Sequence, residues 1–133
     1  MQQKNKELLL KDLCARLPYG VKVRDELGRI NKLVIGNADL VRLYYKDFSI
    51  YSEEKMSLPY LFPLSSMTDE QKKEYYNLCI EEEREKMEFG EWVTRVYYHN
   101  TIESIDWLNK NHFDYRGLIE KGLAIDTTGL NIY

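Results

Sequence analysis

Pro18 separates a helical pattern from a strand pattern, and this change constrains the fold more than any other feature of the chain. Before Pro18, apolar residues recur at the spacing of one helical face, which predicts a helix over residues 4–17. A proline disfavours helical geometry at the preceding residue, so the helix is expected to end there. The predicted apolar stripe consists of Leu10, Leu13, Cys14 and Leu17, and the side chains of Lys11, Asp12 and Arg16 are expected to point away from it.

The chain after Pro18 has the composition of β-strands, because β-branched and aromatic residues dominate and turn residues interrupt them. Alternation predicts one strand over residues 21–24, a second over 30–35 and a third that begins near Val41. Gly28 lies in the loop between the first two, where a positive φ is expected. A change of phase inside the third run indicates a bulge or another turn. We therefore expect an antiparallel meander of three or four strands.

Helical patterns return in the second half of the chain. Residues 52–67 contain two prolines and are predicted to form a connection that lies against the core. Thr68 and Gln71 then match a capping box, which predicts a helix from there to about Met87. The acidic run over residues 81–88 carries basic residues at helical spacing and is interpreted as a solvated helix face.

The last third of the chain contains one ambiguous segment and two further helical patterns. Residues 92–98 suit either a strand or the start of a helix. Asn100 and Glu103 form a second capping signal, and a last short helix is predicted over residues 116–123. The sequence therefore predicts a single α+β domain over residues 1–133, with an N-terminal helix, the meander and about three helices on one face of the sheet.

Composition excludes several classes of protein. The 133 residues carry 19 basic and 22 acidic side chains, and the net charge of −3 argues against a protein that coats nucleic acid. No apolar run approaches the roughly 20 residues that span a bilayer, and the N-terminus does not resemble a signal peptide. We therefore expect a cytoplasmic protein without membrane contact. Cys14 and Cys79 are expected to be buried, reduced thiols, and the less favoured alternative is one disulfide between them.

No motif for catalysis, metal binding or nucleotide binding is present in the sequence. Its histidines and cysteines lack the short spacings of zinc ligands, and no G-x-S-x-G or phosphate-binding glycine motif occurs. We therefore predict no cofactor, no metal and no enzymatic activity. The alternative is a small enzyme whose site is assembled only in the folded chain, from among Cys14, Cys79, His99 and His112.

The segment over residues 112–117 gathers an imidazole, a carboxylate, a phenol and a guanidinium. One interpretation is a recognition patch of His112, Tyr115 and Arg116, in which the guanidinium binds a carboxylate or phosphate. The other is a structural junction, in which Asp114 accepts backbone N–H bonds at the start of the last helix and Arg116 pairs with a nearby acid. The structural interpretation is favoured.

Eleven tyrosines and two tryptophans are a high aromatic content for this length, and several occur as adjacent pairs that cannot all point inward. Such residues are common in contact surfaces, so a protein partner or self-association is predicted. The alternative is binding of single-stranded nucleic acid on a basic strand face that carries Arg24, Arg42 and Tyr44.

Three segments of the chain resemble a known group of proteins. They cover residues 8–23, 59–68 and 106–125 and include Leu-Pro-Tyr-Gly-Val-Lys-Val, Pro-Tyr-Leu-Phe-Pro-Leu and Asp-Trp-Leu-Asn-Lys-Asn-His-Phe-Asp-Tyr-Arg-Gly. Together they resemble small uncharacterised proteins of gut Bacteroides species and of their phages and mobile elements. The resemblance implies a cytoplasmic, phage-linked setting, and it implies no activity, cofactor or catalytic residue.

Overall fold

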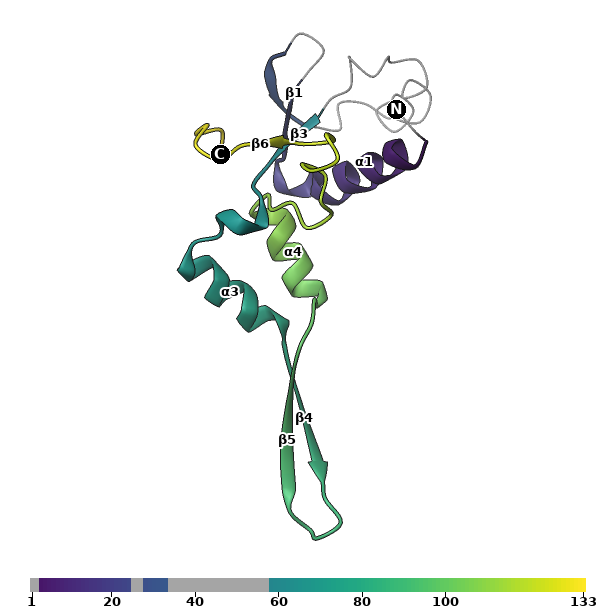
Figure 1. Ribbon diagram of the computed structural model, residues 1–133, viewed down its shortest axis with the longest axis vertical. Helices are drawn as coiled ribbons and strands as arrows, with labels where there is room; N and C mark the ends of the chain where they lie inside the picture. The colour runs from purple at the N-terminus through teal and green to yellow at the C-terminus, as the bar shows by residue number, and fades with distance from the viewer. Residues whose placement is uncertain (1–2, 25–27, 34–57) are drawn as a thin grey trace. The chain divides into compact units, whose positions relative to one another are not determined.

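The computed structural model describes residues 3–24, 28–33 and 58–133, and these residues form an α+β structure (Figure 1). The internal contacts of the chain divide it into two compact units. Unit 1 consists of Met1–Ser66 and Asn109–Tyr133, and unit 2 is Met67–Leu108. Unit 2 is therefore inserted in the sequence of unit 1.

The predicted N-terminal helix is confirmed, but its buried face differs from the prediction. Helix α1 spans Gln3–Arg16, and the short 3₁₀ helix η1, Leu17–Tyr19, follows it. The buried residues of α1 are Leu9, Asp12, Leu13 and Arg16. The interior face is therefore rotated from the predicted stripe. Cys14 is exposed, and Asp12 and Arg16, which were predicted to point outward with Lys11, are buried. The reason is that Asp12 and Arg16, four residues apart, satisfy each other as an ion pair.

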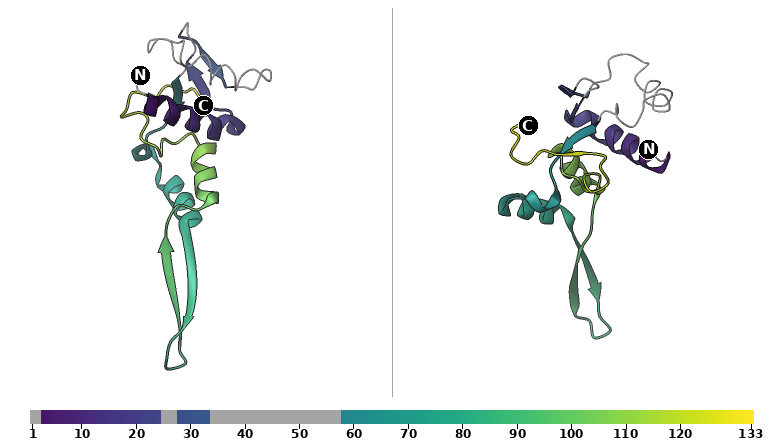
Figure 2. Two further views of the ribbon diagram at one scale, coloured as in Figure 1. Left: turned by 90° about the vertical axis from the view of Figure 1, so that its right-hand side faces the viewer. Right: turned by 45° about the horizontal axis from the view of Figure 1, so that its top comes forward.

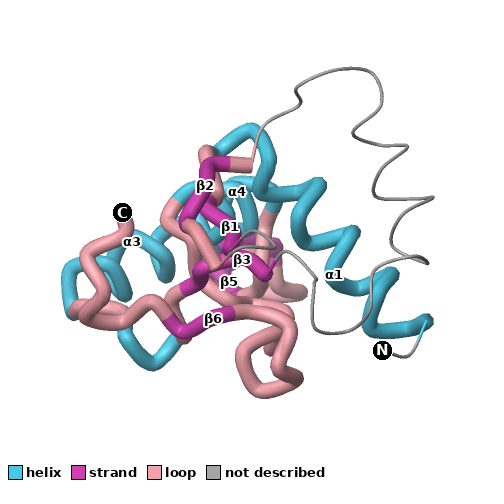
Figure 3. The backbone as a smooth tube through the Cα atoms, turned by 90° about the horizontal axis from the view of Figure 1, so that it is seen from above, coloured by secondary structure: helices cyan, strands magenta, loops and turns pink. Residues whose placement is uncertain are grey.

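Unit 1 contains a four-stranded sheet in the order β2-β1-β3-β6 (Figure 3). Its strands are β1, Lys22–Arg24; β2, Ile30–Lys32; β3, Leu58–Leu61; and β6, Ile125–Asp126. The predicted hairpin of β1 and β2 is confirmed, with Lys22 opposite Lys32, and Gly28 in its loop has a φ of 77°. The predicted third strand of the meander, near Val41, lies outside the described residues.

The connection predicted over residues 52–67 is wrong for Leu58–Leu61. This segment is β3, which pairs antiparallel with β1 and parallel with β6. A proline has no N–H to donate within a sheet. Pro59 lies opposite Val23 of β1, but β6 pairs only with Tyr60 and Leu61, so the missing N–H of Pro59 removes no hydrogen bond to β6. The apolar side chains of α1 and the sheet share one core, which includes Leu9, Leu13, Val21, Val23, Leu61, Leu118 and Leu123.

The helix predicted over residues 116–123 is absent, because this described segment forms a series of turns. Leu118 and Leu123 of this segment, and Ala124 directly after it, are nevertheless buried in the core of unit 1. The bridge between Phe62 and Phe113 precedes these turns, and strand β6 follows them. The C-terminal segment of unit 1 therefore contributes to the sheet and to the core without forming a helix.

Unit 2 begins with helix α3, Asp69–Cys79, and its predicted capping box is confirmed. The Gln71 amide N donates to Thr68 Oγ1 at 3.1 Å, and the Thr68 amide N donates to Gln71 Oε1 at 2.9 Å. The prediction that this helix continues to Met87 is wrong. From Ile80 the chain is extended and forms strand β4, Ile80–Lys86.

The ambiguous segment is strand β5, Trp92–Tyr98, which pairs antiparallel with β4 over its whole length (Figure 2). We call this pair of strands the ribbon. Helix α4, Ile102–Lys110, follows it. Its cap is one residue later than predicted, because the Ser104 amide N donates to Thr101 Oγ1 at 3.0 Å and the Thr101 amide N donates to Ser104 Oγ at 2.7 Å. In the described part of the chain, no helix has the length and apolar character needed to cross a membrane.

Candidate functional site

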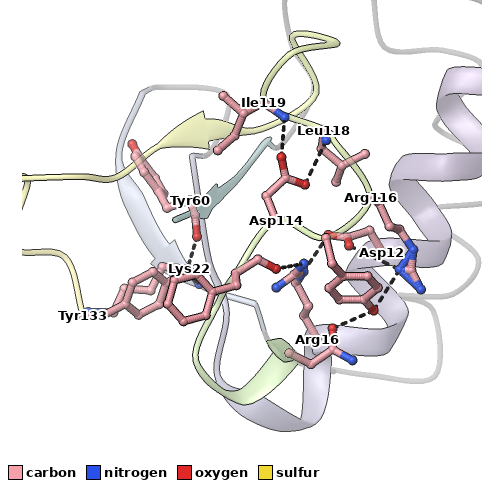
Figure 4. A network of polar contacts seen from close by, with 12 residues as sticks. Asp12, Arg16, Lys22, Tyr60, Asp114, Arg116, Leu118, Ile119 and Tyr133 are labelled. Atoms are coloured by element: carbon pink, nitrogen blue, oxygen red, sulfur yellow. Dashed lines mark hydrogen bonds and ion pairs between the residues drawn. The ribbon is translucent and has the colours of Figure 1, made fainter. Parts of the chain in front are cut away.

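Two charged residues of α1 face the interior of unit 1. Asp12 and Arg16 are four residues apart, so the helix places them on one side, and both side chains are fully buried. Arg16 Nε donates to Asp12 Oδ2 at 2.8 Å, and Arg16 Nη2 donates to the carbonyl oxygen of Phe113 at 2.6 Å (Figure 4). Arg16 therefore links α1 to the C-terminal segment of the same unit.

Tyr115 and Arg116, two residues of the predicted recognition patch, join this ion pair. Arg116 Nη1 is 3.4 Å from Asp12 Oδ1 and donates to the Tyr115 hydroxyl at 3.0 Å. The Tyr115 hydroxyl in turn donates to Asn109 Oδ1 at 3.0 Å. The guanidinium carbons of Arg16 and Arg116 lie 5.2 Å and 4.7 Å from the centroid of the Tyr115 ring, within the range of cation–π contacts. We call Asp12, Arg16, Tyr115 and Arg116 the polar cluster.

The electrostatics of the polar cluster fit a structural role. Burial raises the pKa of Asp12 above its usual value, and the charges of Arg16 and Arg116 oppose this shift. Removing one partner of such a buried pair leaves an uncompensated charge, which is strongly destabilising. Because the Arg116 guanidinium is directed at Asp12 and Tyr115, it is held inside the unit.

Asp114 holds the first of the C-terminal turns. It is buried, and its two carboxylate oxygens accept hydrogen bonds from the amides of Leu118 at 2.8 Å and Ile119 at 2.9 Å. The backbone hydrogen bonds predicted for Asp114 are therefore present, although they stabilise a turn and not the first turn of a helix. A short acidic side chain can satisfy successive amide groups in either setting.

His112, the third residue of the predicted patch, has a φ of 63° and stacks on Tyr133. The ring centroids are 3.7 Å apart and the ring planes differ by 12°. Burial, together with the positive charges of Arg16 and Lys22, lowers the pKa of His112 from 6.5 to about 4. The neutral imidazole is therefore the stable form in the folded chain at neutral pH.

The hydroxyl of Tyr133 joins two strands of the sheet. It accepts a hydrogen bond from the Lys22 amide at 2.9 Å and donates one to the Tyr60 carbonyl oxygen at 2.7 Å. Burial raises the pKa of Tyr133 to about 12. The ammonium group of Lys22 donates to the Ile132 carbonyl oxygen at 2.5 Å. The ammonium group of Lys22 therefore binds a backbone carbonyl of unit 1.

The residues proposed for nucleic-acid binding are only partly described. Arg24 lies on β1, where it is half-buried and opposite Ile30. Arg42 and Tyr44 lie outside the described residues. The strand face of β1 thus presents Arg24, while the ammonium of its neighbour Lys22 binds a backbone carbonyl.

The cysteines and histidines each have separate surroundings. In unit 2, Cys79 is buried, and burial together with the neighbouring thiol of Cys79 raises the pKa of Tyr75 to about 12. His99 Nε2 lies 3.0 Å from Glu81 Oε2 on the exposed ribbon. Both cysteines are free thiols, and Cys14 is exposed and belongs to unit 1. Among the residues that the structure describes, no three His, Cys, Asp or Glu side chains come together as a metal site.

The ribbon of unit 2 is exposed along its length. Every residue of β5 is exposed, and so are the residues of β4 after Ile80. Tyr98 has 66% of its surface exposed, and Trp92 has 58%. Exposed apolar side chains mark contact sites when they lie together on one surface.

The two faces of the ribbon differ in chemistry, because side chains alternate along each strand. The even-numbered face carries the aromatic and aliphatic side chains of Trp92, Val96 and Tyr98, and Arg84 lies 5.2 Å from the centroid of the Trp92 ring. The odd-numbered face is acidic. It carries Glu81, Glu83, Glu85, Val93, Arg95 and Tyr97, with Arg95 Nη2 3.2 Å from Glu85 Oε2.

Sequence reasoning did not place a contact surface on the ribbon. The aromatic content pointed to exposed aromatic residues, and the alternation of Val93, Arg95 and Tyr97 with their neighbours was a strand signal. The acidic run before it, which has the composition of a helix, obscured the partner strand.

The chain matches no protein-family model, no curated protein and no solved structure. Function must therefore be argued from the geometry of the two units. In unit 1 the predicted patch is directed inward, and Tyr115 and Arg116 bind groups of the same unit. In unit 2 the ribbon places aromatic side chains and strand edges in solvent.

Proposed function

We propose that this chain is a non-enzymatic accessory protein that binds another polypeptide along strand β5 of the ribbon. The observation that carries the proposal is the exposure of all of Trp92–Tyr98, a strand rich in aromatic and β-branched residues. Trp and Tyr are enriched among the residues that contribute most to protein–protein binding. The resemblance noted in the sequence makes a cytoplasmic, phage- or mobile-element-linked setting part of the proposal.

The architecture of the ribbon supports strand addition as the mode of binding. In the described part of the chain, β4 and β5 form a sheet of two strands. Two strands alone are marginally stable in water, and a third strand or a covering surface adds stability. A polypeptide that pairs with a free strand edge gains backbone hydrogen bonds, while side-chain contacts on the faces supply specificity.

The even-numbered face supplies such contacts. Trp92, Val96 and Tyr98 lie on one side of β5 at two-residue spacing, so an added strand would place its own apolar side chains beside them. Covering these side chains stabilises the complex by roughly 25 cal/mol per Å² of apolar surface removed from water. The bound polypeptide is therefore expected to carry apolar or aromatic residues at alternate positions.

Site-specific photo-crosslinking in cells of the source organism tests this proposal. A photoreactive phenylalanine derivative replaces Tyr98, which is 66% exposed on the ribbon, or Tyr76, which is 55% exposed on α3 and serves as a matched control. We expect covalent adducts with a polypeptide from position 98 and none from position 76. The absence of adducts at position 98, or equal adducts at both positions, would contradict the proposal.

A further inference from the structure

We infer that the polypeptide bound along β5 is a second copy of this chain, whose own β5 pairs with the first in antiparallel orientation. This inference rests on the proposed function, because it names the partner of the same strand. It follows from the direction of the backbone groups of β5, from the distribution of charge over the two strands, and from the symmetry of a strand paired with itself.

The direction of the backbone groups follows from the ends of the ribbon. The Met87 amide donates to the Glu91 carbonyl oxygen at 2.7 Å, and the His99 amide donates to the Cys79 carbonyl oxygen at 3.0 Å. These are pairs of odd-numbered residues in the same register as the rest of the ladder. Hydrogen-bonded and non-hydrogen-bonded pairs alternate in an antiparallel ladder. The odd-numbered residues of β5 therefore bond to β4, and the even-numbered residues direct their N–H and C=O groups to the other edge.

The charges of the two strands distinguish their edges. Strand β4 carries four glutamates with one arginine and one lysine, a net charge of −2, whereas β5 carries Arg95 as its one charged residue. Charged side chains protect strand edges from pairing. Two copies of β4 side by side would bring their glutamates together, and this repulsion disfavours pairing along that edge. Strand β5 has only one charged side chain, that of Arg95, and it contains neither proline nor glycine.

A symmetric register gives hydrogen-bond partners to the N–H and C=O groups at the free edge of β5. When two β5 strands pair about Val96, the N–H and C=O groups of even-numbered residues meet those of the second copy. Thr94 then lies opposite Tyr98 of the second copy, and Arg95 lies opposite the aromatic ring of Tyr97 of the second copy. Pairing about Arg95 would instead place two arginines directly opposite each other, which is unfavourable. Twofold pairing of this kind closes on itself as a dimer.

The resulting sheet has four strands, in the order β4-β5-β5-β4, with β5 from each copy at its centre. Its even-numbered face carries Trp92, Val96 and Tyr98 from both copies, with the Thr94 side chains between them. The acidic strands lie at the two outer edges, where their charge protects the sheet from further pairing. The assembly therefore ends at two copies.

Paired proline variants of the full chain test this inference by light scattering coupled to size exclusion. Val96 and Glu82 face each other across the ribbon, and the N–H of each points away from the other strand, so proline at either position leaves the bonds between β4 and β5 in place. We expect the wild type to have twice the mass of one chain, Val96→Pro to have half the mass of the wild type, and Glu82→Pro to retain the wild-type mass. A monomeric wild type, a dimeric Val96→Pro or a monomeric Glu82→Pro would each overturn the inference.

Disulfide trapping keeps the test valid if a proline disturbs folding. In a Cys14→Ser background, which removes the exposed thiol, Val96→Cys places two thiols across the twofold axis. Cα atoms in a hydrogen-bonded antiparallel pair are about 5.5 Å apart, within the range of disulfides. We expect mild oxidation to crosslink this variant into dimers and to leave Glu82→Cys monomeric, and the reverse result would overturn the inference. Adducts from position 98 to other proteins, with a monomeric wild type, would retain the proposed function and overturn only the dimer.

Discussion

The ring of Tyr133 lies nearly flat on the imidazole of His112, with centroids 3.7 Å apart and planes 12° apart. This stacking covers one side of the imidazole, and His112 Nδ1 is buried without a hydrogen-bond partner in the described residues. A proton on this ring would place a positive charge near Arg16 and Lys22 in a poorly solvated position. The stacked pair therefore depends on a neutral histidine.

We expect the free energy of unfolding to fall as the pH is lowered from 6.5 to about 4. In this window the unfolded chain binds a proton on His112 and the folded chain does not, so acid favours unfolding. His112→Asn removes the titrating group and keeps a residue type that tolerates a positive φ. Urea unfolding across this window should give a weaker pH dependence for the variant, and an identical dependence in both chains would contradict the assignment.

Tyr133→Phe is expected to lower the free energy of unfolding by about 1–3 kcal/mol. The hydroxyl bonds to Lys22 and Tyr60 are lost, and both backbone groups lose a partner. Chemical denaturation measures this cost. The control is Tyr98→Phe, whose hydroxyl is on the exposed ribbon and whose loss should change stability by less than about 0.5 kcal/mol. Equal effects of the two substitutions would contradict the role of the Tyr133 hydroxyl.

Arg16→Ala is expected to cost about 3–5 kcal/mol, because the fully buried Asp12 would retain only the more distant Arg116 as a charged partner. Arg116→Ala should cost less, about 1 kcal/mol, because Asp12 keeps its closer partner Arg16 and loses only a contact of 3.4 Å. Urea unfolding of the two variants compares these costs. A larger loss of stability in Arg116→Ala than in Arg16→Ala would contradict the assignment of Arg16 as the stronger partner of Asp12.

Asp114→Ala should lower stability by about 0.5–2 kcal/mol, the range for a lost side-chain cap of backbone amides. The amides of Leu118 and Ile119 would lose their acceptors in a partly buried turn. Asp114→Asn keeps one acceptor oxygen and should show a smaller loss. Thermal unfolding distinguishes the three chains. Unchanged stability in Asp114→Ala, together with loss of the photo-adducts, would instead indicate a recognition role for this segment.

Local signals in the sequence predicted the elements whose stability is local. The capping box of Thr68 and Gln71 and the hairpin glycine Gly28 depend on neighbouring residues, and both agree with the structure. The bounds of α1 agree to within one residue at each end. The α+β class followed from the same signals. The buried face of α1 did not, because periodicity assigns charged residues to solvent and an i,i+4 ion pair can be buried instead.

Long-range pairing accounts for the remaining differences. Residues of β4 are strong helix formers, and their strand conformation depends on the register with β5, which propensity does not describe. Likewise, Leu58–Leu61 becomes a strand because β1 and β6 bind it. The sequence identified a dense group of polar residues at positions 112–116, but the inward direction of Tyr115 and Arg116 follows from Asp12, 104 residues away from Arg116.

Because unit 2 is inserted in the sequence of unit 1, the ribosome synthesises all of unit 2 before it completes unit 1. Translation proceeds from the N-terminus, so α1, β1 and β3 emerge before β6 and before Phe113, whose carbonyl accepts the hydrogen bond of Arg16. The ribbon is synthesised in between. Its aromatic strand is therefore complete while the sheet of unit 1 still lacks β6, its last strand.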